Sequence, residues 1–143
     1  MKVIKIIYTF VFLFMMMPVM AQKREISTAR NWVKSGNNLD KAEQSMMTLL
    51  KDSANRNNEK IWSVLFESLR KQYASVNEKL YLKQKYDTVA LFNIASRMFT
   101  VMASYDSIDA MPGKDSKINP QYRKDNSSLL NSLRPNLYNG GLF

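Results

Sequence analysis

The stretch NEKIWSVLFESLRKQYASVNEKL, residues 58–80, decides the fold class of this chain. Its large apolar side chains recur every three or four positions, at Ile61, Leu65, Leu69, Tyr73, Val76 and Leu80. A repeat near 3.6 residues places them on one face of a helix, and that face must be buried against other elements. We therefore predict a long helix from about Asn58. The pattern leaves open whether it breaks near Asn77 or continues to about Gln84.

The segments on either side predict further helices. Upstream, residues 24–35 and 39–52 each carry an apolar face, and Gly36 between them suits the left-handed residue that ends a helix. Such a short link makes the two helices antiparallel. Downstream, Asp87 is typical of a helix N-cap. The apolar stripe that follows it consists of Leu91, Ile94, Ala95, Met98, Met102, Tyr105 and Ile108.

The last part of the chain predicts a loop and then one or two helices. Residues 110–119 are mostly polar and contain Pro112-Gly113, which is typical of a turn. Pro120 suits the first turn of a helix that would run to about Leu133. Pro135 has no backbone N–H, so we expect it to break that helix or to start a separate one over residues 135–143. Together the segments predict an all-α fold.

The composition narrows the classes of function. The chain has 143 residues and a net charge of +9, and it contains neither Cys nor His. Their absence excludes Cys–His and Ser–His nucleophiles and makes a structural zinc site very improbable. Asp106 and Asp109 stand three apart near a predicted helix end, where ordinary surface polarity explains them better than acid–base chemistry. We expect no catalytic residue, no cofactor and no metal.

The N-terminal residues 1–21 read as a cleavable signal peptide. Lys2 and Lys5 precede an apolar run from Ile6 to Met17, and a small residue, Ala21, precedes the expected cleavage point between Ala21 and Gln22. An uncleaved membrane anchor is the alternative. The apolar run is shorter than a spanning helix needs, so we expect no transmembrane span after processing. The remaining residues, 22–143, then form a single exported domain.

Residues 29–53, ARNWVKSGNNLDKAEQSMMTLLKDS, carry details of a known family. They resemble a tetratricopeptide repeat, a helix hairpin with small residues where its two helices cross and a glycine at the turn. The resemblance implies antiparallel hairpins stacked as a short solenoid. The residues that carry it are Ala29, Trp32, Gly36, Ala42, Met46 and Leu49.

The resemblance is degenerate. Leu39 stands where these repeats have an aromatic residue, no proline closes the hairpin, and residues 58–109 are too long for one repeat. An irregular helical bundle is therefore the alternative fold. The tail after Pro135 resembles the first half of an opening helix, with Gly141 as its small packing residue. This suggests that the chain is the N-terminal part of a longer repeat protein, whereas a tail that tucks back into the core is the alternative.

Three tripeptides place Ser or Thr after Asp and before an apolar residue. They resemble the acceptor pattern of O-glycosylation in the periplasm of some Gram-negative bacteria, which would make Ser53, Thr88 and Ser107 the acceptors. Ordinary helix capping is the alternative. It explains Asp87 well, but Asp52 and Asp106 poorly.

These features favour an exported scaffold that binds a partner protein in the periplasm or at the outer envelope of a Gram-negative bacterium. The alternative is a basic helical module that adheres to anionic envelope surfaces, since an exported chain of this charge meets such surfaces rather than nucleic acid. The identity of the partner is not encoded in any motif. Aromatic side chains expected to be exposed, and so available as anchors, are Trp62, Tyr73, Tyr81 and Tyr86.

Overall fold

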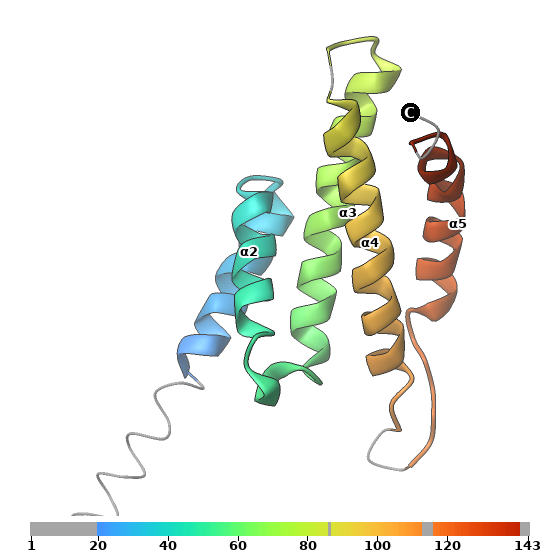
Figure 1. Cartoon of the computed structure of the whole chain (residues 1–143). Coiled ribbons are helices and arrows are strands. Elements are labelled where there is room, and N and C mark those ends of the chain that lie inside the picture. Colours follow the sequence, from blue (N-terminus) through green and yellow to red (C-terminus); the bar gives the residue numbers. More distant parts are fainter. Residues whose placement is uncertain (1–19, 86, 113–115, 141–143) are drawn as a thin grey trace, which may run out of the picture.

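The computed structural model describes residues 20–85, 87–112 and 116–140, and helices are the only regular elements among them (Figure 1). Residues 20–35 form the first helix. It is followed by α2 (Leu39–Leu49), the short 3₁₀ helix η1 (Ser53–Asn55), α3 (Glu59–Tyr81), α4 (Thr88–Asp109) and α5 (Arg123–Gly140). The predicted all-α class is confirmed.

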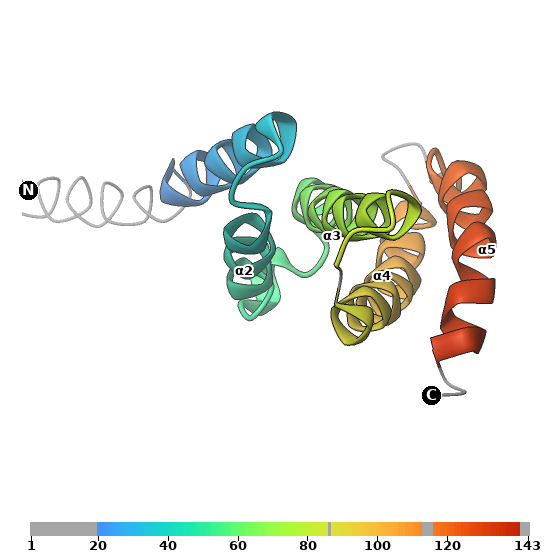
Figure 2. The same ribbon diagram turned by 90° about the horizontal axis from the view of Figure 1, so that it is seen from above.

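Successive helices run up and down and lie side by side in chain order. α3 packs against both α2 and α4, and α4 packs against α5. Seen from above, the first helix and α3 lie along one side of the molecule, while α2 and α4 lie along the other (Figure 2). The connections that precede α2, α3 and α4 are short enough to favour return onto the neighbouring helix, whereas a longer one separates α4, which ends at Asp109, from α5, which begins at Arg123.

The core lies along the predicted apolar stripes. In α3, Ile61, Leu65, Leu69 and Tyr73 are buried, whereas Val76 is half-buried and Leu80 is exposed. The stripe of α4 is buried from Leu91 to Tyr105. Two aromatic rings extend the contact between α3 and α4, since Phe66 and Tyr105 lie with centroids 6.4 Å apart. The 3.6-residue period therefore predicted the buried faces well, except at the end of α3.

Local capping sets most of the helix bounds. Gly36 adopts φ +74°, the left-handed conformation expected of it. The Asp87 carboxylate accepts the N–H of Ala90 at 2.9 Å, as predicted for an N-cap. The Asp52 carboxylate accepts the N–H of Ala54 at 3.0 Å and so caps η1, and α2 ends at Leu49 rather than near residue 52 as predicted. α3 continues through Asn77 without a break.

The predictions for the last helix were wrong in two respects. Pro120 does not lie in its first turn, because α5 begins at Arg123. Pro135 neither breaks nor restarts it, because one helix runs through that residue to Gly140. A proline removes a single helical donor, and packing on both sides of it holds the helix. Leu133 is buried in the core, and the Asn136 side chain donates to the Tyr73 hydroxyl.

Candidate protein-binding groove

A hollow of ≈ 240 Å³ lies between the first helix and α3. Its apolar floor is formed by Val33 and Val64, which are only 7% and 4% exposed. Helical spacing of three or four residues places the remaining lining side chains on the two facing surfaces. They are Arg30 and Lys34 from the first helix and Ser63, Glu67 and Lys71 from α3. We call this hollow the basic groove.

The charges of the basic groove favour an acidic ligand. Arg30, Lys34 and Lys71 contribute three cations, and Glu67 contributes the single carboxylate among the lining residues. That carboxylate already pairs with Arg70 at 2.7 Å. The Lys71 Nζ lies 3.4 Å from the Lys34 carbonyl oxygen and donates to it, which ties the two walls together. An excess of positive charge over an apolar floor suits a segment that carries both carboxylates and aliphatic side chains.

The small residues predicted for the crossing of the first helix and α2 are buried. Ala29 and Ala42 are fully buried, as is Met46 beside them. A larger side chain at either alanine would hold the two backbones apart. Trp32 and Leu49 are half-buried and pack against the core cluster. The remaining residue predicted for repeat packing, Gly141, lies outside the described residues.

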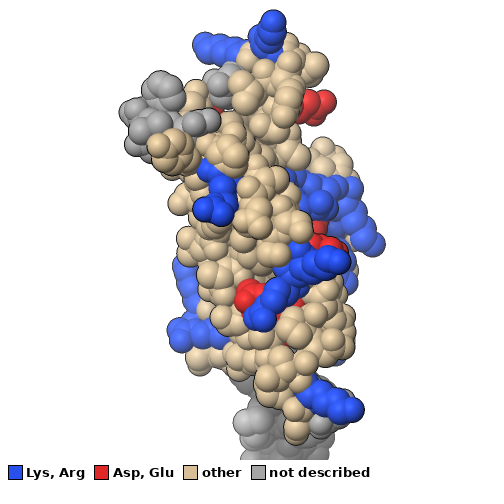
Figure 3. All heavy atoms as spheres, turned by 90° about the vertical axis from the view of Figure 1, so that its right-hand side faces the viewer, with Lys and Arg blue, Asp and Glu red and all other residues tan. Residues whose placement is uncertain are grey.

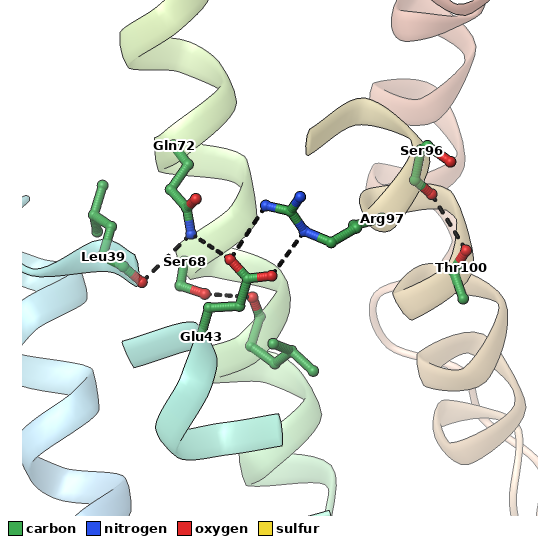
Figure 4. A network of polar contacts seen from close by, with 8 residues as sticks. Leu39, Glu43, Ser68, Gln72, Ser96, Arg97 and Thr100 are labelled. Carbon is green, nitrogen blue, oxygen red and sulfur yellow. Dashed lines mark hydrogen bonds and ion pairs between the residues drawn. The ribbon is translucent and has the colours of Figure 1, made fainter. Parts of the chain in front are cut away.

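A polar network joins three helices beside this hairpin (Figure 4). Glu43 of α2 accepts from the Arg97 Nε of α4 at 2.8 Å and from the Gln72 Nε2 of α3 at 2.8 Å. Gln72 also reaches the Leu39 carbonyl at 3.4 Å. We call this the Glu43 network. Sequence reasoning missed it, because nothing in one sequence pairs Glu43 with a residue 54 positions away.

The two aspartates near the end of α4 hold the loop and α5 in place. Asp106 accepts from Arg123 through both oxygens, at 2.7 and 2.8 Å, and this hydrogen bonding lowers the pKa of its carboxyl group. Asp109 accepts the N–H groups of Gln121 and Tyr122, each at 3.0 Å. Both carboxylates are thus engaged in structural contacts. Within the described residues, no group of acidic side chains could hold a metal ion.

The proposed glycan acceptors are all accessible. Ser53 and Thr88 are exposed at the first residues of η1 and α4, and Ser107 is exposed in the last turn of α4. Capping accounts for Asp52 as well as Asp87, contrary to our expectation for Asp52, while Asp106 pairs with Arg123. Glycosylation stays a prediction. A mass of the native protein equal to that of the bare polypeptide would contradict it.

Of the aromatic residues expected to be exposed, Tyr81 is exposed and Trp62 is half-buried. The Trp62 Nε1–H donates to the Arg56 carbonyl at 2.7 Å, so the indole belongs to the α2–α3 connection. Tyr73 is buried, and the expectation for it was wrong because it lies on the apolar stripe of α3. Tyr86 lies outside the described residues.

No protein-family model, curated protein sequence or solved structure matches the chain. Among the helices of the described residues, none combines the length and the hydrophobicity needed to cross a membrane.

Proposed function

We propose that this chain is an exported, tetratricopeptide-repeat-like scaffold without catalytic activity, which binds an acidic segment of a partner protein in the basic groove. The observation that carries the proposal is the groove itself. Two different hairpins contribute its walls, and three cations surround its apolar floor. Antiparallel helices packed in chain order support the stacked-hairpin arrangement, since such stacks present extended surfaces between neighbouring hairpins.

Electrostatic attraction and apolar burial would both contribute to binding in the groove. Exposed Arg30 and Lys34 would attract carboxylates at long range and speed association, an effect that salt weakens. Val33 and Val64 would bury aliphatic side chains of the partner and slow its release. A partner held in this way is retained at moderate salt, whereas a purely electrostatic contact is lost.

Capture of envelope proteins from the native host tests this proposal. We expect wild-type chain to retain a defined partner that a charge-reversed groove, Arg30→Glu with Lys34→Glu and Lys71→Glu, no longer retains. The matched control reverses three exposed lysines elsewhere, Lys51, Lys60 and Lys124. Retention by the control and loss by the groove variant would support the groove. Equal loss in both variants, or a partner that survives in both, would contradict it.

We also propose that the chain is exported to the periplasm or outer envelope of a Gram-negative bacterium and cleaved between Ala21 and Gln22. The basic and apolar pattern of residues 1–21 supports this. N-terminal sequencing of the protein from fractionated cells is the test. An N-terminus at Gln22 in the envelope fraction is expected, and an intact Met1 in the cytoplasmic fraction would overturn the proposal.

A further inference from the structure

The connection between α3 and α4 extends beyond the neighbouring turns at the same end of the molecule (Figure 1). We define the α3–α4 tip as residues 79–85 together with Val89. α3 is long enough to carry its last turn past the end of the first hairpin (Figure 1), where its apolar stripe is less covered by the described helices than it is near Leu65 and Leu69. Leu80, the last residue of that stripe, is accordingly exposed.

Three large apolar side chains of the tip are exposed. Tyr81 is 81% exposed, Leu82 59% and Val89 68%. Exposed apolar residues scattered singly are normal on a protein surface, but a cluster at a projecting end marks a site of interaction. These side chains do not line the basic groove, which lies between the first helix and α3.

The backbone of the tip forms a hydrogen-bonded turn. The Gln84 N–H donates to the Lys79 carbonyl at 2.9 Å, and the Lys83 N–H donates to the Leu80 carbonyl at 3.1 Å. Lys83 adopts φ +54°. These are the two hydrogen bonds and the left-handed residue of a Schellman motif, which here uses lysine where glycine is usual. The turn therefore holds Tyr81 and Leu82 at the end of α3 in a fixed geometry.

Lysines are interleaved with the apolar residues. Lys79, Lys83 and Lys85 fall within seven positions and are all exposed. Basic side chains stand at the same extreme end of the molecule in Figure 3. Two acidic residues flank them. Asp87 is engaged as the N-cap of α4, where the helix terminus offsets its charge, and Glu78 directly precedes Lys79 at the start of the tip.

We propose that the α3–α4 tip inserts into the surface of a bilayer that contains anionic phospholipid. Tyr81, Leu82 and Val89 would enter the boundary between headgroups and acyl chains, while the three lysines would extend to the phosphates around them. Three exposed lysines beside exposed apolar side chains match a layer of lipid phosphates above an acyl interior, and this is why we commit to a lipid surface here. This contact is separate from the basic groove, so either proposal can fail without the other.

Vesicle binding by the full chain tests the inference. We compare vesicles of phosphatidylcholine alone with vesicles of equal parts phosphatidylcholine and phosphatidylglycerol. The N-terminal residues carry Lys2 and Lys5 beside their apolar run and would favour the anionic vesicles as well, so the difference between the vesicles is read together with the tip variants described next. We expect tighter binding to the anionic vesicles, weakened by salt, and equal binding to both would overturn the proposal.

Tip variants separate charge from insertion. Reversing Lys79, Lys83 and Lys85 to Glu is expected to weaken binding to anionic vesicles at least about tenfold. Replacing Leu82 and Val89 with Ser is expected to weaken it while leaving its dependence on salt. The control is again the reversal of Lys51, Lys60 and Lys124, which should weaken binding to anionic vesicles less than the tip reversal does. Equal losses for the two reversals would show a diffuse charge effect and overturn the proposal.

A labelled cysteine reports insertion directly, because the chain contains no cysteine of its own. Leu82→Cys carrying an environment-sensitive fluorophore should brighten when anionic vesicles are added. Asn57→Cys, at the opposite end of the molecule, should not. No change at position 82 would overturn the proposal. So would a concentration-dependent dimer that the Leu82 and Val89 substitutions dissociate, because a second copy would then cover the tip.

Discussion

The Glu43 network and the junction between α4 and α5 both join helices through carboxylates, but their surroundings differ. The Glu43 side chain is 16% exposed and lies among α2, α3 and α4. The Asp106 side chain is 36% exposed, and its partner Arg123 is more exposed still. α3 and α4 each bury seven residues, whereas the described part of α5 buries Leu133 alone.

This difference indicates which contacts hold the molecule together. Exposed ion pairs contribute little to stability because water and salt screen them, whereas buried apolar groups contribute most. We therefore expect α5 to open locally with a smaller free energy than α3 and α4. The polar contacts at its start fix where the helix begins, and Leu133 with its half-buried neighbours holds it against the core.

The largest effect is expected from truncating the core of α3. Leu69 is fully buried, so Leu69→Ala should lower the free energy of unfolding of the whole domain by about 2–5 kcal/mol. Leu133→Ala should instead speed hydrogen exchange mainly in α5. Urea denaturation measures the change in the free energy of unfolding, and residue-resolved hydrogen exchange measures the local opening of α5. If Leu133→Ala increased exchange in α3 as much as in α5, α5 would not open separately from the core, and this prediction would be wrong.

The next effect concerns the crossing of the first helix and α2. Ala42 is fully buried, so Ala42→Leu should force the two helices apart and lower the free energy of unfolding by about 1–3 kcal/mol. Ala74 lies exposed on α3, and Ala74→Leu is the matched control, which should change stability little. Thermal unfolding of the two variants compares them. A neutral Ala42→Leu would argue against close packing at this crossing.

A smaller effect is expected from the two carboxylates themselves. Glu43→Gln keeps the shape of the side chain but weakens its bonds to Arg97 and Gln72, and should cost about 1 kcal/mol. Asp106→Asn weakens a solvent-exposed pair and should leave the global unfolding midpoint unchanged. Denaturant midpoints at low and high salt provide the measurement. An equal loss in both variants would mean that burial does not distinguish the two junctions.

The smallest effect appears only in alkaline solution. Burial raises the pKa of Tyr105 from 10.0 to about 12, and a hydrogen bond from Ser63 partly offsets this. The neutral phenol is favoured in the folded state, so its contribution is complete below pH 10 and is lost as the pH rises toward about 12. Tyr105→Phe should flatten the fall in unfolding free energy over that range. An unchanged slope would contradict the assignment, because lysines alone would then account for it.

The predictions from sequence succeeded where the conformational preference of a single residue sets the end of a helix. Asp87 caps α4 and Gly36 ends the first helix, as expected from their own conformational preferences. They failed at Pro135, where the local preference of proline against a helix was outweighed by the packing of Leu133 and the contact of Asn136 with Tyr73. They also failed at Tyr73, which was expected to be an exposed anchor. Its position on the apolar stripe of α3, rather than its residue type, decides that it is buried.

By itself, the sequence determined that the chain is all-α and which face of α3 and α4 is buried, because an apolar period of 3.6 residues sustained along a segment is typical of a helix with one buried face. The tertiary structure alone decided that Glu43 bridges three helices, and that lysines from two hairpins meet in the basic groove. It also decided that Leu80, the last residue of the α3 stripe, is exposed. These features depend on helix lengths and on contacts between residues far apart in the chain, which local periodicity does not encode.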